Sequence, residues 1–374
     1  MSRKARESGT LPRPLAVLAA FVLAGATALA IRMLPAGAEP APPAGAAPVR
    51  FAPPQRPAAV RQPPGSFVGF VDTARDPEFD LAAESRATGV ARYALGHLVA
   101  DGDGCLVRWA GPPRPAGEPD AAGLGPPRPA GDPDAAGLGR LRAAGEPDAA
   151  GLGRLRAAGE PVAGLGQLRA AGGDAFPVFG GPGGDDPAVT CTRPGGLATA
   201  YRKAVGAFGA AAAAFEIRDA ADPAVAPRRA RALRALQGER PLRVFFTLRL
   251  TPDGLDAADL AALRATRREG VRVDAVELLA EMEPRTGPQG RLRRLGSAVR
   301  AAAGQLARAY GLADEEQVWE RLALTPVLAR AGDLDEPEAR KLAEYAVRHG
   351  LAWLSLRGTS PKPEISRILW KTHS

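Results

Sequence analysis

Short apolar runs rich in β-branched and aromatic residues alternate along this chain with longer segments in which apolar residues recur at spacings of three and four. The first pattern is typical of buried β-strands and the second of amphipathic helices. The alternation predicts parallel βα units. The expected strand runs are 67–73, 91–101, 174–181, 212–219, 242–250, 272–283, 324–330 and 351–358, with helical patterns between them at, for example, 196–206, 257–269, 297–310 and 337–349.

Eight strands separated by helices over this length predict an α/β fold, the closed (β/α)8 TIM barrel. The alternative is an open doubly wound sheet. A nucleotide-binding sheet of that kind would need a Gly-rich fingerprint after its first strand, and none is present there. In a barrel, the residues that do chemistry belong at the carboxyl ends of the strands, so we expect functional side chains there.

Residues 1–34 have the pattern of an export signal or a membrane anchor. Basic residues precede an uncharged, mainly apolar run of 17 residues from Leu15 to Ile31. The segment could be removed as a signal peptide or kept as a membrane anchor, because its apolar run is near the lower limit of length for a bilayer span. The preceding positive charges place the remainder of the chain outside the cell. We therefore expect a protein that is secreted or anchored to the outer face of the membrane, with residues 35–66, rich in Ala and Pro, as an extended linker.

A 14-residue unit repeats within residues 112–166, with copies beginning at Ala116, Ala130, Ala144 and, shortened, Ala158. Solenoid units are longer, and each copy here is rich in Gly and Pro, which interrupt helices and strands. We interpret the repeat as a low-complexity insertion in a barrel over 67–358, with residues 359–374 as a tail. The regularly spaced arginines leave a wall-binding arm as the alternative.

Composition adds a prediction about the cysteines. The chain has 374 residues, of which 45% are hydrophobic, so it can bury a large core in one main domain. It contains two cysteines, Cys105 and Cys191. Because exported proteins meet an oxidising environment, we predict a disulfide between them. Two separate buried thiols are the alternative.

The net charge of +8 raises the question of an anionic partner. The arginines are dispersed and no recognition motif accompanies them, so we expect no nucleic acid partner. Attraction to anionic wall polymers or lipid headgroups is the simpler interpretation. The three histidines, His97, His349 and His373, lack the spacing of metal ligands, so no metal site and no cofactor is expected. His97 is expected in the core or at the rim of the second strand.

Short motifs follow one another from the first predicted strand to the last. They include Val71-Asp72, Phe79-Asp80-Leu81, Thr88-Gly89-Val90, Cys105 with Trp109, Ala171-Gly172-Gly173-Asp174, Phe179-Gly180-Gly181, Thr190-Cys191-Thr192, Thr247-Leu248, Gly270-Val271, Leu324-Thr325-Pro326 and His349-Gly350. In this order they resemble the exported bacterial chitinases of glycoside hydrolase family 18. The resemblance covers about residues 67–356, the repeat excepted, and implies a barrel that takes N-acetylated glycan.

The resemblance also implies a mechanism. In that family a Glu at the end of the fourth strand protonates the glycosidic oxygen, the substrate's own N-acetyl group attacks the anomeric carbon, and a neighbouring Asp stabilises the charged ring. The family motif Asp-x-x-Asp-x-Asp-x-Glu falls on Ala211, Ala214, Glu216 and Arg218, so none of its four positions matches. An arginine stays protonated to above about pH 12 and cannot donate the proton.

Three further positions depart from the family pattern. The sixth strand carries Glu281 and Glu283 in place of a Met-x-Met-Asp-Tyr-like run. Arg357 stands where a tryptophan would underlie the central sugar, and Val178 stands where a Ser is expected. Together with the missing acid, these changes indicate that the family chemistry is lost.

Side chains alternate between the two faces of a strand, and this alternation predicts which of the substituted side chains meet. Residues 214, 216 and 218 share one strand face, as do 281 and 283, and both sets are expected to point into the barrel. Arg218 could then pair with Glu216, Glu281 or Glu283, because a buried arginine requires such partners. We interpret the group as a structural ion cluster. The alternative is a rebuilt site, in which Arg218 or Arg357 binds an anionic sugar and a Glu supplies the proton.

Two tryptophans are considered for sugar stacking. Trp109 is a candidate platform, with packing as the alternative, whereas Trp353 is expected in the core. Two functions remain open. The first is an exported chitinase-like protein without hydrolase activity that binds N-acetylated glycan such as chitin, or a protein partner. The second is an active glycosidase that cleaves β-1,4-linked N-acetylglucosamine polymers with a relocated acid.

Overall fold

The computed structural model describes residues 66–371 except 77, 103–104, 112–162, 284–289 and 313. Its strands are β1 Ser66–Phe67, β2 Gly69–Asp72, β3 Arg92–Asp101, β4 Leu106–Trp109, β5 Asp174–Gly180, β6 Ala212–Glu216, β7 Arg243–Arg249, β8 Ala275–Glu281, β9 Leu322–Leu328, β10 Trp353–Leu354 and β11 Arg357–Gly358. The predicted leader, the linker up to residue 65 and the repeat up to residue 162 lie outside the described residues.

The strands form one closed, mainly parallel sheet with the order β1, β10, β9, β8, β7, β6, β5, β3, β2. The sheet is closed by residues 66–72, in which Val68 separates β1 from β2. The N–H of Val68 donates to the carbonyl of Leu354 at 2.9 Å. This stretch therefore pairs with β10 on one side and with β3 on the other. The predicted (β/α)8 barrel is confirmed.

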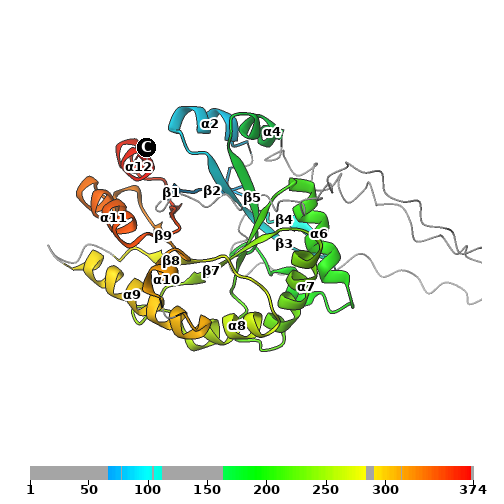
Figure 1. The fold of residues 1–374 in the computed structure, drawn as a ribbon. Coiled ribbons are helices and arrows are strands. Elements are labelled where there is room, and N and C mark those ends of the chain that lie inside the picture. Colours follow the sequence, from blue (N-terminus) through cyan, green and yellow to red (C-terminus); the bar gives the residue numbers. More distant parts are fainter. Residues whose placement is uncertain are drawn as a thin grey trace, which may run out of the picture. The chain divides into compact units, whose positions relative to one another are not determined.

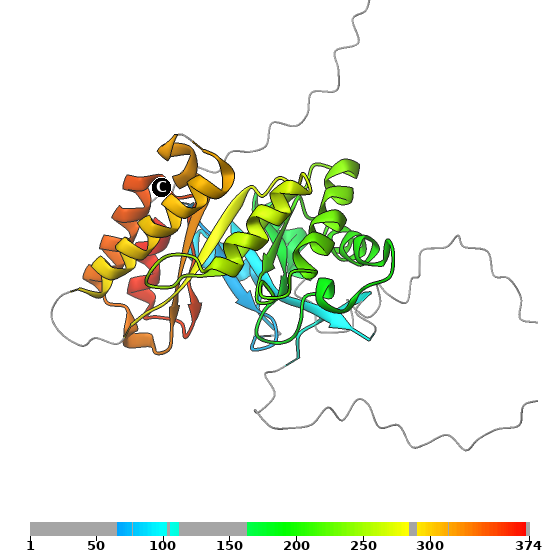
Figure 2. The ribbon, with the colours of Figure 1, turned by 90° about the horizontal axis from the view of Figure 1, so that it is seen from below.

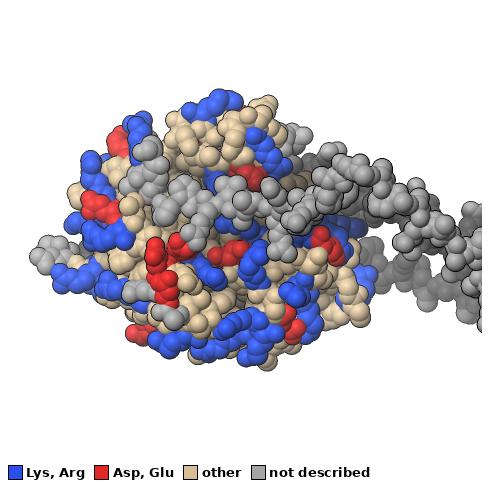
Figure 3. Space-filling model, in the orientation of Figure 1, with Lys and Arg blue, Asp and Glu red and all other residues tan. Residues whose placement is uncertain are grey.

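Helices cover the outside of this sheet (Figures 1 and 2). Asp80, Asp256 and Asp335 begin three of them by accepting hydrogen bonds from backbone N–H groups of the first turn. Figure 3 shows Lys and Arg gathered along the edge where α8 lies in Figure 1. The helices are α2 Leu81–Thr88, α4 Ala163–Ala170, α5 Pro187–Thr190, α6 Gly196–Phe208, α7 Val225–Glu239, α8 Ala257–Arg268, α9 Arg291–Tyr310, α10 Glu315–Trp319, α11 Glu336–His349 and α12 Pro363–Lys371.

Alternation along the strands divides the aromatic side chains between two layers. Phe215 of β6 packs outward against Tyr201 of α6, with ring centroids 5.1 Å apart. Phe245 of β7 packs inward, 5.2 Å from Phe176 and 5.0 Å from Trp353. The predicted core position of Trp353 is confirmed, since it is 2% exposed. Aromatic rings thus fill the lower part of the barrel and leave its upper part to polar side chains.

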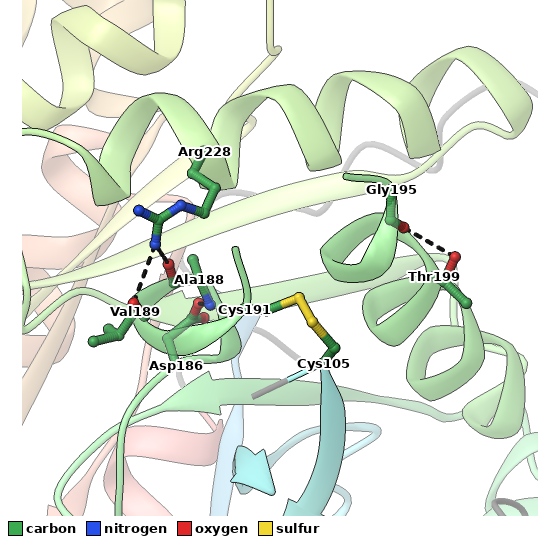
Figure 4. The surroundings of a disulfide bond; sticks show 8 residues. All are labelled: Cys105, Asp186, Ala188, Val189, Cys191, Gly195, Thr199 and Arg228. Atoms are coloured by element: carbon green, nitrogen blue, oxygen red, sulfur yellow. Dashed lines mark hydrogen bonds between the residues drawn. A yellow bond between two sulfur atoms is a disulfide. The ribbon is translucent and has the colours of Figure 1, made fainter. Parts of the chain in front are cut away.

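A disulfide joins Cys105, which lies just before β4, to Cys191, which follows α5, so the predicted pairing is confirmed. Figure 4 shows the bond beside α5. Arg228 of α7 donates to the carbonyls of Ala188 and Val189 at 2.5 and 3.1 Å. The disulfide and this arginine together fix the short α5 segment against the rim of β4 and against α7.

The carboxyl-terminal segment belongs to the barrel. Residues 359–374 are predicted as a tail, but α12 packs against α11 and β1. Ile365 and Leu369 are buried at helical spacing, and Trp370 lies edge-on to Phe67 with centroids 6.0 Å apart. The segment is an amphipathic helix that covers the first strand of the barrel. None of the helices in the described part of the chain has the length and hydropathy needed to cross a membrane.

Candidate functional site

A polar cavity of about 450 Å³ lies at the carboxyl ends of the barrel strands. We call it the mouth cavity. A smaller cavity of about 300 Å³ adjoins it and shares Phe70, Asp72, Arg75, Arg357 and Gly358 with its wall. The strand-end side chains lining the mouth cavity are Asp72, His97, Glu216, Arg218, Thr247, Arg249, Glu281 and Arg357.

Glu216, the last residue of β6, anchors the floor of the cavity. Its Oε2 accepts a hydrogen bond from Arg357 Nη1 at 2.6 Å and one from His97 Nε2 at 3.1 Å. All three side chains are buried, with exposed fractions below a tenth. A buried carboxylate is stable only with such partners. The floor therefore contains a buried ion cluster, in which Glu216 is the one acid that the sequence predicts and Arg357 is the close cation.

Glu277 of β8 is the second carboxylate of this cluster. It accepts hydrogen bonds from the hydroxyls of Thr247 and Thr325, each at 2.6 Å, and from Arg357 at 3.2 Å. The register aligns Glu216 with Thr247 and Thr247 with Glu277 across β6, β7 and β8, so the three lie at one level of the barrel. We call Glu216, Glu277, Arg357 and His97 the floor cluster.

Sequence reasoning missed Glu277 and the two threonines. The available signal was parity, since 277 lies on the same strand face as 281 and is an acid in an otherwise apolar run. His97, expected in the core or at the rim, lies 4% exposed at the wall of the cavity. The guanidinium carbon of Arg357 lies 4.0 Å from the centroid of Phe70, so the arginine also covers an aromatic face.

The floor cluster holds Glu216 in its ionised form. Burial alone would raise its pKa, but the hydrogen bond from His97 and the positive charge of Arg357 outweigh burial and lower the pKa of Glu216 to about 2. A carboxylate with that pKa carries no proton at neutral pH. Glu216 can therefore stabilise positive charge or accept hydrogen bonds, but it cannot serve as a proton donor.

Arg218 does not point into the floor, contrary to the parity prediction. Strand β6 ends at Glu216, so the alternation of faces no longer applies two residues later. The side chain of Arg218 is 57% exposed, and its Nε forms a long ion pair with Glu216 Oε1 at 3.9 Å, so of its three predicted partners Glu216 is the one it meets. It still lines the mouth cavity. The guanidinium thus lies at the rim, above the buried carboxylate.

Glu281 and Glu283 do not join Arg218 either. Glu281 ends β8 at the rim, where it is 69% exposed and accepts a hydrogen bond from Arg249 at 2.7 Å. Glu283 lies beyond the strand and accepts a hydrogen bond from Arg294 of α9 at 2.8 Å. The predicted pairing of these two acids with Arg218 is wrong, because each has an arginine nearer to its own strand end.

Trp109 is not a sugar platform. It is 7% exposed and packs edge-on against Phe208 of α6, with centroids 5.6 Å apart. It does not line the mouth cavity. The packing alternative is correct, since β4 turns the residue toward α6 and away from the strand ends that form the mouth.

A second buried ion network lies behind the cavity wall. Arg229 of α7 is 1% exposed, donates a short hydrogen bond to Asp219 and lies 3.5 Å from Asp186. The hydroxyl of Tyr201 also donates to Asp186, at 2.5 Å. Burial would lower the pKa of Arg229, but the charges of Asp186 and Asp219 raise it. This network fixes the loop that follows β6 to α7.

Asp259, in the first turn of α8, is a carboxyl of the cavity wall whose pKa is raised. It lines the mouth cavity and is 4% exposed. Burial, together with the negative charges of Asp256 and Asp219, raises the pKa of Asp259 to about 7. Asp259 therefore retains its proton to much higher pH than Glu216 does.

No group of three or more His, Cys, Asp or Glu side chains in the described part of the chain is arranged to hold a metal ion. The carboxylates of the floor and rim face arginines and threonines instead. The groups available to a ligand are a cation at the rim, an ionised acceptor at the floor and a carboxyl with a raised pKa in the wall.

Comparison with solved structures identifies the barrel type. The catalytic domain of the hyperthermophilic chitinase from Pyrococcus furiosus superposes with a TM-score of 0.61 at 21% identity, covering 83% of this chain and 97% of that one. The chain therefore has the fold of a chitinase catalytic domain. No sequence family model and no curated protein sequence matches it.

Two further structures are similar to the chitinase-like barrel. Catalytic-site mutants of active domain 2 of the thermostable Pyrococcus furiosus chitinase, complexed with chito-oligosaccharides, give a TM-score of 0.61 at 22% identity, with 83% of this chain and 96% of that one covered. A putative chitinase A from Streptomyces coelicolor gives a TM-score of 0.50 at 12% identity, with 83% and 97% covered. At these identities the likeness establishes the fold alone.

Proposed function

We propose that this chitinase-like protein binds N-acetylated glycan such as chitin in its mouth cavity and does not hydrolyse it by the family mechanism. One observation carries the second half of the proposal. The position that the resemblance assigns to the proton donor holds Arg218, and the nearest carboxyl, Glu216, has a pKa of about 2. Neither group can protonate a leaving oxygen near neutral pH.

The binding half rests on what the cavity offers. A cavity of about 450 Å³ can take small-ligand groups, and its strand-end location is where barrel proteins bind ligands. Glu216 Oε1 faces the rim arginine and can accept from a sugar N–H or hydroxyl. A related barrel crystallised with chito-oligosaccharides. Because Arg357 covers Phe70, polar contacts outweigh ring stacking in this proposal.

The test uses the purified full chain, chitin oligomers and insoluble chitin. We expect no new reducing ends and sedimentation of the protein with chitin. The same assays on Arg218→Glu test whether a carboxyl at this position is sufficient to restore cleavage. Arg75→Glu is the matched control, because Arg75 lines the same cavity with similar exposure. Turnover by the unmodified chain would overturn the loss of hydrolysis, and failure to sediment would overturn glycan binding.

A second candidate, an active glycosidase with a relocated acid, is favoured by one observation. Asp259 lines the same cavity as Glu216, and the pKa values of the two carboxyls are about 7 and about 2. Two carboxyls with separated pKa values are the arrangement that acid–base catalysis requires. If the unmodified chain releases reducing ends and Asp259→Asn abolishes this release, Asp259 is the acid and this candidate replaces the first.

The proposed location is the outer face of the cell membrane or the extracellular space. The disulfide supports export, because such bonds persist in oxidising compartments. Attachment to the membrane would come through residues 1–34. Fractionation of expressing cells tests both: a protein found reduced in the cytosol would overturn export, and one released in soluble form without residues 1–34 would overturn the anchor.

A further inference from the structure

Four arginines are found among the described residues of the mouth cavity wall: Arg75, Arg218, Arg249 and Arg357. Three of them have a close carboxylate. Arg357 lies 2.6 Å from Glu216 and 3.2 Å from Glu277. Arg249 lies 2.7 Å from Glu281, and Arg75 lies 3.4 Å from Asp72. The positive charge of each of these three is therefore balanced within the wall.

Arg218 is different. Its nearest carboxylate in the described wall is Glu216, at 3.9 Å, beyond hydrogen-bond distance. The other oxygen of that carboxylate already accepts from Arg357 and His97. The guanidinium of Arg218 is 57% exposed at the rim, with its planar set of N–H donors unused by any close acid. Arg218 thus borders the cavity with only a long ion pair, whereas the other three arginines each have a carboxylate within 3.4 Å.

We propose that Arg218 makes the mouth cavity selective for N-acetylated glycan that bears a carboxylate over the same glycan without it. The inference rests on the proposed glycan binding and names the class of glycan. A guanidinium fork matches the two oxygens of a carboxylate. A single ligand charge suits this site better than a phosphate dianion, because Asp72, Glu216 and Glu281 lie in the same wall.

The size of the effect follows from the exposure of Arg218. Ion pairs in contact with water are weak, whereas a bidentate pair in a partly enclosed cavity is stronger, so we expect about a fivefold to tenfold preference. The preference should decrease as salt is added, because the rim is accessible to ions. Arg218→Lys, which keeps the charge but loses the fork, should retain only part of it.

The test compares two probes with one backbone. The first is β-1,4-linked N-acetylchitotetraose. The second is the tetrasaccharide in which every second N-acetylglucosamine carries a 3-O-lactyl group, which adds a carboxylate, and its methyl ester serves as the neutral control for the added bulk. Calorimetry on the full chain should show tighter binding of the lactyl acid than of the ester or chitotetraose. Arg218→Gln should remove the difference.

Arg75→Gln is the matched control, since Arg75 lines the same cavity with 62% exposure but is paired with Asp72. This variant should keep the preference, and thermal unfolding should verify that both variants fold. Equal binding of all three probes, or a preference that persists in Arg218→Gln, would overturn carboxylate selectivity and leave glycan binding standing. Binding of none of the probes would overturn the proposed function itself.

Discussion

The two arginines of the mouth, Arg357 at the floor and Arg218 at the rim, have opposite environments. Arg357 is 7% exposed, contacts two carboxylates and covers an aromatic ring. Arg218 is 57% exposed and contacts one distant carboxylate. Both stand where the resemblance expects other residues, a tryptophan and a glutamic acid. The buried replacement has become part of the folded core, whereas the exposed one remains available to a ligand.

The difference follows from where each side chain leaves the sheet. Arg357 lies on β11, so strand geometry directs it among the side chains of β6 and β8. Arg218 lies two residues past the end of β6, in a loop that Arg229 holds through Asp219. The same residue type is thus structural in one place and accessible in the other.

The largest expected effect is on the floor. Arg357→Met leaves Glu216 and Glu277 buried without their cation, and should lower the free energy of unfolding by about 3 to 5 kcal/mol, as measured by urea denaturation. Adding Glu216→Gln to this variant should recover part of the loss, because one uncompensated charge is then removed. A stability equal to that of the unmodified chain would show that the floor cluster is not structural.

The pH dependence of stability sharpens the same contrast. The pKa of Glu216 is about 2 in the folded chain and about 4.5 as the ordinary value, so its contribution is complete above about pH 4.5 and is lost as the pH falls toward 2. The loss should reach about 3 kcal/mol. A Glu216→Gln variant should show a shallower decline over this range, and an unchanged slope would contradict the assignment.

Asp259 should behave in the opposite sense. Its pKa is about 7 in the folded chain and 3.8 as the ordinary value, so stability from this group is complete below about pH 4 and declines as the pH rises to 7. Asp259→Asn should therefore be more stable than the unmodified chain at pH 8, by up to about 4 kcal/mol, and about equal to it at pH 4. Unfolding curves at the two pH values measure the difference.

The smallest effect is expected at the rim. Arg218→Gln should change the free energy of unfolding by less than about 0.5 kcal/mol, because an exposed side chain without a close partner contributes little. Arg249→Gln, which breaks an exposed pair with Glu281, is the comparison variant and should cost no more than about 1 kcal/mol. A loss at Arg218 as large as that at Arg357 would remove the distinction between floor and rim.

The predicted strand runs match the barrel closely because apolar runs and turns are local signals. Parity correctly placed Ala214 and Glu216 inside, since β6 continues through both. It was wrong for Arg218 because it assumed a strand to residue 219. Strand β6 ends at Glu216, and the buried contact between Arg229 of α7 and Asp219 holds the residues that follow it in a loop.

The floor cluster was predictable only in part. The sequence indicates that charged residues occupy the mouth, but it does not say which acid meets which base. Glu277 pairs with Arg357 across 80 residues, and Glu216 does so across 141. Such pairings follow from barrel closure and register. The helix α12 was missed because its apolar residues are buried by packing against β1 and α11, which is a tertiary contact that the local sequence does not show.

The disulfide has a consequence for how the repeat can evolve. Cys105 and Cys191 are separated by 86 residues, and the 14-residue copies lie between them. The entropy of closing a loop rises only with the logarithm of its length, so one copy more or fewer changes the closure free energy by about 0.1 kcal/mol. Variation in copy number should therefore be nearly neutral for the stability of the barrel, so the repeat can gain or lose copies.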